Sequence, residues 1–208
     1  MTIARLRPEL RIDPTAIIDT GSITGVSGAQ VCSAEAAAAY GPLFFQGEYF
    51  WYNVARNNVV PSLPGLQFQG GYAEASLVLT GETHRYLPAT GAYGGIVPAN
   101  PFSPWEGGWN PGAWELAGRF STVDLNDNFT PGVPPGKTSA VGGGQQTVYA
   151  VGLNWYPNTN VRFMFDYLHG DINKKFSLAA GGGIAGTALG TPVGGNFDAV
   201  VLRSQFAF

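Results

Sequence analysis

Apolar and polar residues alternate with a period of two along most of this chain, and helical periodicity is hard to find. Such alternation is typical of β-strands, because successive side chains of a strand point to opposite faces. The pattern predicts eight strands, at 3–12, 34–40, 43–53, 68–79, 113–122, 146–156, 161–169 and 198–208. We therefore expect an all-β fold built from antiparallel strands.

Each predicted strand has an uncharged face and a polar face. The uncharged face collects large apolar side chains from strand after strand, such as Leu10, Trp51, Leu77, Leu116, Phe120, Tyr149, Leu153, Phe163, Phe165 and Leu202. The polar face carries almost all of the charges on the strands, which are Arg5, Arg7, Glu9, Arg11, Glu35, Glu48, Glu74, Glu115, Arg119, Arg162, Asp166 and Arg203. A sheet with two such faces separates two different environments.

Two architectures fit this pattern. In a soluble sandwich the apolar face packs on a second sheet, whereas in an outer-membrane barrel it contacts lipid and the polar face lines a watery lumen. Trp and Tyr gather near the strand ends, where headgroups would lie, and the strands are about ten residues long, as a tilted crossing needs. The last predicted strand also ends on Phe208. We expect the transmembrane β-barrel and keep a ligand-binding sandwich as the alternative.

The connections between the strands differ in length on the two sides. Short turns at 41–42 and 157–160 fall on one side, and longer stretches rich in Gly, Pro, Asn and Ser fall on the other, at 13–33, 54–67, 123–145 and 170–197. Barrels show this asymmetry between short periplasmic turns and long outer loops. The segment 80–112 departs from it, because it is long and lies on the turn side. Its prolines exclude an ordinary central strand, so we expect an extended periplasmic excursion.

Composition excludes several classes of protein. Charged residues make up only 12% of the chain and aromatic residues 13%, which argues against a disordered polyelectrolyte and a coiled coil. The net charge of −3 disfavours a nucleic-acid partner, and the single Cys32 cannot form an internal disulfide. The chain has no apolar run of the length that a membrane-spanning helix needs.

Six stretches of the sequence resemble one known family, the phosphate-selective porins O and P. They are QGEYF at 46–50, LTGE at 79–82, GAWELAGRFS at 112–121, GLNWY at 152–156, NVRFMF at 160–165 and the closing LRSQFAF at 202–208. The resemblance spans almost the whole chain but corresponds to the C-terminal half of the family's barrel. It implies a sixteen-stranded barrel in the bacterial outer membrane, commonly a trimer, whose lumen arginines serve anion passage.

The length of the chain bears on this expectation. Eight strands closed on themselves leave an interior that side chains fill, whereas sixteen enclose an aqueous pore. An open half would leave two unpaired edges in lipid, at a cost of several kcal/mol per unsatisfied group. We therefore expect residues 1–208 to be one porin segment of a larger barrel. A self-contained eight-stranded barrel with a structural or adhesive role remains the alternative.

The arginines on the polar face are the sharpest candidates for function. Guanidinium groups along a lumen attract anions and bind phosphate with two hydrogen bonds. The predicted pore-lining residues are Arg5, Arg7, Arg11, Arg119, Arg162, Arg203, Glu48, Glu74, Glu115 and Asp166. Acids and arginines are about equally frequent on this face, so we favour ion pairs along the wall over selective anion attraction. The expected function is passive diffusion of small hydrophilic solutes, leaning to anions such as phosphate.

No catalytic residue, cofactor or metal site is predicted. His84 and His169 are the two histidines, and with Cys32 they make a poor set of metal ligands. His169 lies near Asp166 and Asp171 in the sequence, but a solvated strand end explains it better than a catalytic pair. Gly142–Gly144 and Gly181–Gly183 are interpreted as flexible loops, and Gly71 and Gly152 as sites of bending or close packing.

Overall fold

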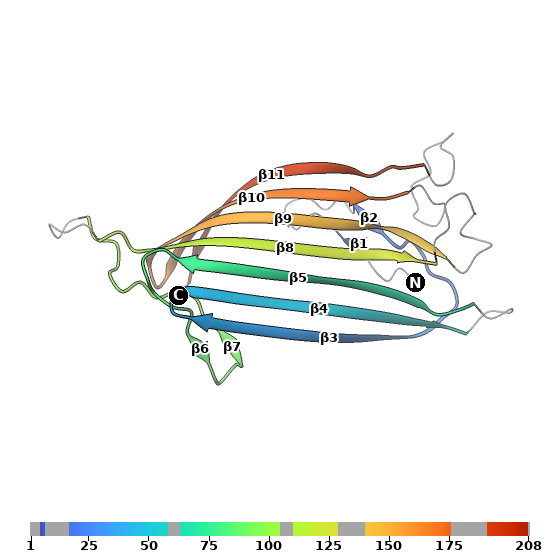
Figure 1. Ribbon diagram of the computed structural model, residues 1–208, viewed down its shortest axis with the longest axis horizontal. Helices are drawn as coiled ribbons and strands as arrows, with labels where there is room; N and C mark the ends of the chain where they lie inside the picture. Colours follow the sequence, from blue (N-terminus) through green and yellow to red (C-terminus); the bar gives the residue numbers. More distant parts are fainter. Residues whose placement is uncertain are drawn as a thin grey trace.

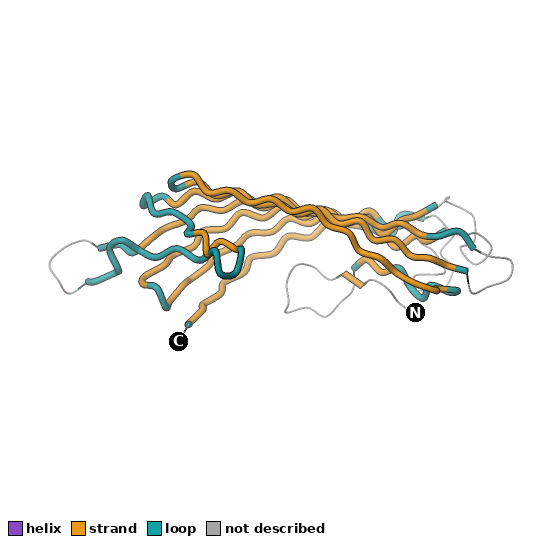
Figure 2. Tube along the Cα trace, turned by 90° about the horizontal axis from the view of Figure 1, so that it is seen from below, coloured by secondary structure: helices purple, strands orange, loops and turns teal. Residues whose placement is uncertain are grey.

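Seven long strands form one antiparallel sheet, and its curved shape positions everything else (Figures 1 and 2). The computed structural model describes residues 5–6, 17–57, 63–104, 110–128, 140–175 and 191–207. The strands lie in the order β11 (Gly195–Phe206), β10 (Val161–Asn173), β9 (Val141–Asn158), β8 (Ala113–Asp127), β5 (Leu66–Val78), β4 (Leu43–Arg56) and β3 (Val26–Tyr40). No helix in the described part of the chain has the length and hydropathy of a membrane crossing. The expected all-β, antiparallel fold is confirmed.

The pairing register confirms the predicted assignment of residues to faces. One row of directly opposed residues crosses all seven strands and is apolar throughout: Tyr40, Leu43, Leu77, Leu116, Leu153, Phe165 and Leu202. A slip of one residue in any strand would have broken this row, because it would turn that strand's side chains to the other face. The alternation in the sequence therefore determines both the strands and their alignment.

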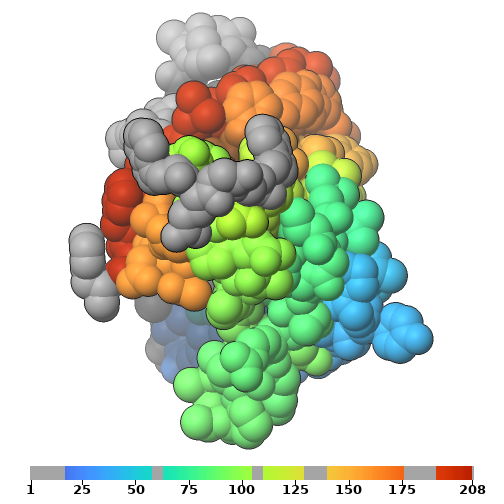
Figure 3. All heavy atoms as spheres, turned by 90° about the vertical axis from the view of Figure 1, so that its left-hand side faces the viewer, coloured from blue at the N-terminus to red at the C-terminus, as the bar shows by residue number. Residues whose placement is uncertain are grey.

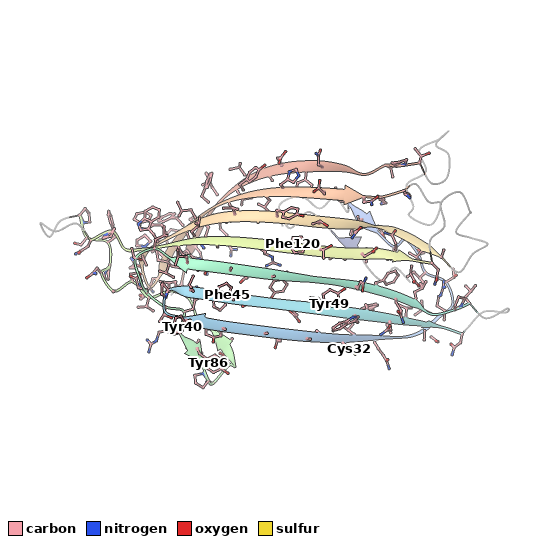
Figure 4. All side chains as sticks on the ribbon, viewed as in Figure 1. Cys32, Tyr40, Phe45, Tyr49, Tyr86 and Phe120 are labelled. Carbon is pink, nitrogen blue, oxygen red and sulfur yellow. The ribbon has the colours of Figure 1, made fainter. Side chains whose placement is uncertain are left out.

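The uncharged face is exposed over its whole width. Leu202 has 78% of its surface exposed, Val151 56% and Leu116 46%. Figure 4 labels Phe45, Tyr49 and Phe120 on this face. The described residues provide no second sheet over it, so the sandwich alternative gains no support. An exposed apolar face of this size suits contact with lipid.

An apolar band of limited height runs along this face. On β4 it extends from Leu43 to Trp51, and the next outward position, Asn53, is polar. At a rise of about 3.3 Å per residue and a tilt of about 40°, this run spans roughly 20 Å, close to the ~25 Å band of outer-membrane barrels. Near the turns the band ends in stacked rings: the centroid of Trp155 lies 5.6 Å from that of Trp114 and 5.5 Å from that of Phe163.

The predicted first strand at 3–12 lies mostly outside the described residues, and its described part does not join the large sheet. Of the range 3–12, the structure describes only Arg5–Leu6, and these two residues form β1, which pairs with β2 (Ile18–Asp19). The edge of the large sheet is therefore β3. Its opposite edge is β11, and the two edges are not paired with each other, so the described strands do not close into a small barrel (Figure 1).

The glycines at 142–144 are a second correction, because they begin β9 and are buried instead of forming a loop. They lie beneath β2: a Cβ at Gly144 would come within 2.9 Å of Cγ2 of Ile18. Ile18 joins an apolar cluster on the polar side of the sheet, with Ile23, Val54, Leu66, Phe68, Leu125 and Val141. At this end of the strands, packed side chains cover the face that is polar elsewhere.

At the other end, the long connection folds back onto the same face. We call residues 79–104 the inner segment; it contains the short hairpin β6 (Tyr86–Leu87) and β7 (Ala92–Tyr93). Its Ile96 packs with Val78, Ala113 and Tyr156 in a buried cluster. Figure 2 shows β1–β2 and β6–β7 on the same side of the sheet. The expected excursion is therefore present as a segment that turns inward.

Candidate functional site

A cavity of about 970 Å³ lies on the polar face, between the sheet and the inner segment. Its walls come from β4, β5, β8, β9, β10 and β11, and from His84, Tyr93, Gly94 and Gly95 of the inner segment. The charged strand residues that line it are Glu74, Glu115, Arg119, Arg162, Asp166 and Arg203. These are six of the ten residues that the sequence predicts to line a pore. Figure 3 views this end of the molecule, where the inner segment forms the green projection below the strand ends.

The other four predicted residues are not among the described residues that line this cavity. Arg7 and Arg11 lie outside the described residues, and Arg5 belongs to β1, whose strand lies apart from the large sheet. Glu48 is on the same face as the cavity but nearer the β3 edge, directly opposite Glu35. These four positions stay predictions as pore-lining residues.

Arg119 is held against the wall from two directions. Its Nη1 lies 3.6 Å from Oε2 of Glu74, directly opposite on β5. Its guanidinium carbon lies 4.3 Å above the centre of the Tyr72 ring, a cation–π contact. The Tyr72 hydroxyl in turn accepts a 2.8 Å hydrogen bond from Nε2 of Gln46. For Arg119 the wall pairing that we favour is therefore present, although both side chains of the pair are about one-third exposed.

The hydrogen bonds of Arg162 within the described part of the chain go to neutral groups. Its Nη2 donates to Oε1 of Gln205 at 2.9 Å, and its Nη1 lies 3.5 Å from the hydroxyl of Tyr156. Arg203 is exposed toward the cavity and shares a row with Asn154 and Glu115. These two guanidinium groups are the ones best placed to meet a solute.

Two glycines in the strands allow close packing, as expected. A Cβ at Gly152 would overlap the Asp166 carboxylate, so the absence of a side chain there makes room for this acid on the neighbouring strand. On the outer face, a Cβ at Gly71 would come within 2.7 Å of Cδ2 of Tyr49. Glycine is required at both positions by what lies above it.

Glu115 is the most deeply buried charge of the cavity wall, with 4% of its surface exposed. Its Oε1 accepts hydrogen bonds from the Ser76 hydroxyl at 2.6 Å and from Nε2 of His84 at 2.8 Å. Its Oε2 accepts from Nδ2 of Asn154 at 3.0 Å and from the Tyr156 hydroxyl at 2.6 Å. These four partners occupy the lone pairs of an ionised carboxylate, which burial alone would disfavour. Glu115 thus anchors the wall and the inner segment together.

His84 is the functional residue that the sequence does not reveal. It stacks on Phe44, with ring centroids 4.4 Å apart, and its Nδ1 lies 3.1 Å from the carbonyl oxygen of Gly94. Burial lowers the pKa of His84, but its hydrogen bond and charge interaction with Glu115 and its hydrogen bond to Gly94 outweigh burial and raise the pKa above the ordinary 6.5. The proline-rich sequence around His84 gives no sign that this histidine contacts Glu115 on β8.

His169 lies on the outer face, away from the cavity. Its Nδ1 lies 2.8 Å from Oδ1 of Asp198 and its Nε2 lies 3.5 Å from Oδ1 of Asp171; both acids are exposed and His169 is half-buried. Asp166 points to the opposite face, into the cavity wall. Among the described residues, no three His, Cys, Asp or Glu side chains converge as a metal site would require.

The arrangement suits reversible contact with small charged solutes. Acidic and basic side chains of the sheet both line the cavity. Its arginines contact neighbouring side chains, and an anion that passes could bind the same guanidinium groups. Conduction requires such weak contacts at several sites, because a tightly held ion does not leave. A wall that carried arginines without acids would hold anions longer.

Comparison with known proteins agrees with this geometry. The family model described as "Phosphate-selective porin O and P" matches residues 1–208. Porin O of Pseudomonas aeruginosa is 26% identical over 144 residues, which is 69% of this chain and 30% of that protein. An uncharacterized protein of Caulobacter vibrioides is 34% identical over 100 residues, 48% of this chain and 17% of that protein. The matched region thus spans less than a third of either relative. An uncharged outward face, a charged inward face and a match over all 208 residues lead to one conclusion: the chain belongs to the phosphate-selective porin O and P family.

Proposed function

We propose that this chain forms part of the wall of an outer-membrane porin, through which small hydrophilic solutes diffuse passively with a preference for anions such as phosphate. The observation that carries the proposal is the cavity, where Arg119, Arg162 and Arg203 lie on the inward face of a porin-family sheet. The similarity to Porin O of Pseudomonas aeruginosa supports a channel over an enzyme. The cavity supplies hydrogen-bonding groups and charges of both signs.

We also propose that residues 1–208 supply roughly half of a larger barrel. Among the described strands, β3 and β11 each pair on one side only, which leaves two edges with free backbone groups. Such edges are costly in hydrocarbon, so further strands are needed on both sides. A sixteen-stranded barrel would enclose an aqueous pore. The proposal includes the bacterial outer membrane as the location and a homotrimer as the assembly.

Replacing Arg119 and Arg162 together with Ala in the complete protein should move the reversal potential of the channel toward cation selectivity. The reason is electrostatic, because the double variant removes two positive charges from a wall that keeps Glu74, Glu115 and Asp166. The measurement is the reversal potential across a planar bilayer in a salt gradient, with chloride and with phosphate. Low salt is preferable, since screening weakens the effect.

Arg85→Ala is the matched control, because this arginine is exposed on the inner segment and does not line the cavity. It removes one positive charge at a position outside the cavity lining and should leave the reversal potential unchanged. If the double variant keeps the parent selectivity, or if Arg85→Ala shifts it equally, the proposed role of the cavity arginines is wrong.

A further inference from the structure

Several contacts hold the inner segment against the sheet, among them a 2.7 Å hydrogen bond from the Phe102 N–H to the carbonyl oxygen of Pro157 and the packing of Phe102 on Trp155. His84 contacts Glu115 on β8 and Phe44 on β4, and the Tyr93 ring packs edge-on against Phe44 at 5.2 Å. Ile96 adds an apolar contact in the cluster with Val78. Within the described residues, the contact with Glu115 is the one ion pair of His84, and both side chains line the cavity.

The surroundings of the His84 ring require a proton on each nitrogen. Nδ1 faces the carbonyl oxygen of Gly94, and Nε2 faces the carboxylate of Glu115. Both groups are acceptors, and a neutral imidazole carries only one N–H, so neutral His84 would leave one acceptor facing a lone pair. The imidazolium satisfies both contacts. Its positive charge also offsets the carboxylate, whose side chain is 5% exposed.

The groups nearest to the His84 ring are acidic or neutral, and the cation Arg162 lies farther away, behind Tyr156. From β5, the Ser76 hydroxyl lies 3.5 Å from Nε2 and the Glu74 carboxylate acts at longer range. From β4, Phe44 is apolar, and from β9, Asn154 and Tyr156 donate to the same carboxylate as His84. Arg162 of β10 lies beyond Tyr156, with its guanidinium carbon 5.7 Å from the centre of that ring.

We propose that His84 is a positioning residue of the pore: its protonated ring clamps the inner segment onto Glu115, which keeps the lumen narrow at this end and cancels a negative charge of the wall. This inference rests on the proposed conduction through the lumen and adds a pH-dependent control to it. Loss of the proton breaks the contact at Nε2 or at Nδ1, so the segment loosens and Glu115 faces the lumen uncompensated.

The direction of the pH dependence follows from the protonated state being the clamped one. Because the pKa of His84 in the folded protein is raised above the ordinary 6.5, the clamp is complete below pH 6.5 and is lost as the pH rises through the raised value. Above it, conductance should increase and selectivity should shift toward cations, since the wall gains an uncompensated carboxylate.

Two readouts on the complete protein test this inference. The first is hydrogen–deuterium exchange of residues 79–104 in detergent micelles, corrected for intrinsic exchange at each pH. The second is conductance and reversal potential in planar bilayers from pH 5 to pH 9. The variants are His84→Gln, which removes the charge, and His84→Lys, which keeps it to higher pH. His169→Gln is the control, because it removes the other histidine of the chain, which lies on the outer face away from the cavity.

The parent protein should lose protection of 79–104 and gain conductance in one transition as the pH rises. His84→Gln should show the unprotected, more conducting state throughout, His84→Lys should shift the transition upward, and His169→Gln should behave like the parent. The inference is overturned if His84→Gln keeps the parent transition, or if His169→Gln abolishes it. If His84→Gln does not fold, His84→Lys tests the inference instead: an upward shift of the pH transition supports it, and an unshifted transition overturns it.

The exchange measurement separates this inference from the proposed function. A protein that shows the pH transition in exchange but passes no ions would contradict the proposed conduction while the clamp itself stands. Normal conduction with no transition in exchange or conductance would contradict the clamp and leave the porin function in place.

Discussion

Leu116→Arg is expected to destabilise the barrel by roughly 1–2 kcal/mol or to block its assembly, because Leu116 lies two residues inside the Trp114 ring at the end of the apolar band and the cost of a charge falls from ~2–4 kcal/mol at the midplane to ~0–1 kcal/mol at the interface. Leu116 lies in the apolar row that crosses all seven strands, on the exposed outward face and inside the apolar band. An arginine there would place a charge in the hydrocarbon, where no water or partner stabilises it. The measurement is the yield of folded protein, detected by heat-modifiable mobility, followed by the unfolding midpoint in guanidinium.

Ala117→Arg is the matched control, because this neighbouring residue points to the opposite face and lines the cavity. The two variants introduce the same charge one residue apart, yet only Leu116→Arg should disturb insertion. Equal yields and equal midpoints for both would mean that the two faces do not meet different environments, which would contradict the assignment of the outward face to lipid.

Glu115→Leu is expected to cost about 3–5 kcal/mol, the range seen when one partner of a buried ion pair is removed. The change leaves Ser76, His84, Asn154 and Tyr156 without their acceptor in a buried place. Buried polar groups that lose a partner cost more than the bond they made. Guanidinium unfolding of the complete protein, followed by tryptophan fluorescence, measures the loss.

Glu74→Leu provides the comparison on the neighbouring strand. The Glu74 side chain is 30% exposed and faces Arg119 at 3.6 Å, so its removal should cost less than about 1 kcal/mol. Similar losses for the two variants would show that the network around Glu115 does not anchor the wall. The pair of variants thus distinguishes a structural carboxylate from one that only lines the cavity.

The alternation of apolar and polar residues predicts most of this fold because a sheet between lipid and water needs it at every strand. Seven of the eight predicted strands are present, and their uncharged positions face outward in register. The ends of the strands are less well predicted. β3 begins at Val26 instead of 34, since its first residues are small and polar and give no apolar rhythm.

The errors have one physical source, which is packing between segments far apart in the chain. Gly142–Gly144 are strand residues because Ile18 packs above them, and the local sequence carries no sign of that contact. Arg56 is a buried end of β4, where its Nε donates to the carbonyl oxygen of Pro64, although the sequence suggests a loop. His84 reaches Glu115 only because the inner segment turns inward. Two neighbours in space need not be neighbours in any periodic pattern.

On the inward face, too, the sequence predicts some features and packing between distant segments determines the others. The polar phase of Glu74, Arg119 and Arg162 follows from alternation alone, and the cavity contains all three. Which of these charges is paired depends on register across strands, as for Arg119 opposite Glu74. The sequence therefore predicts where charges point, and the structure determines which of them a solute can reach.

Spin-label accessibility along β8 tests the central assignment of the two faces most directly. In the complete protein, with Cys32 replaced by Ser, single cysteines at 114 and at 116–120 would be labelled in liposomes and exposed to oxygen and to a water-soluble nickel chelate. We expect oxygen to dominate at Trp114, Leu116, Gly118 and Phe120, and nickel to dominate at Ala117 and Arg119, while the buried position 115 is left unchanged. A uniform profile, or the reverse alternation, would contradict a sheet whose uncharged face meets lipid.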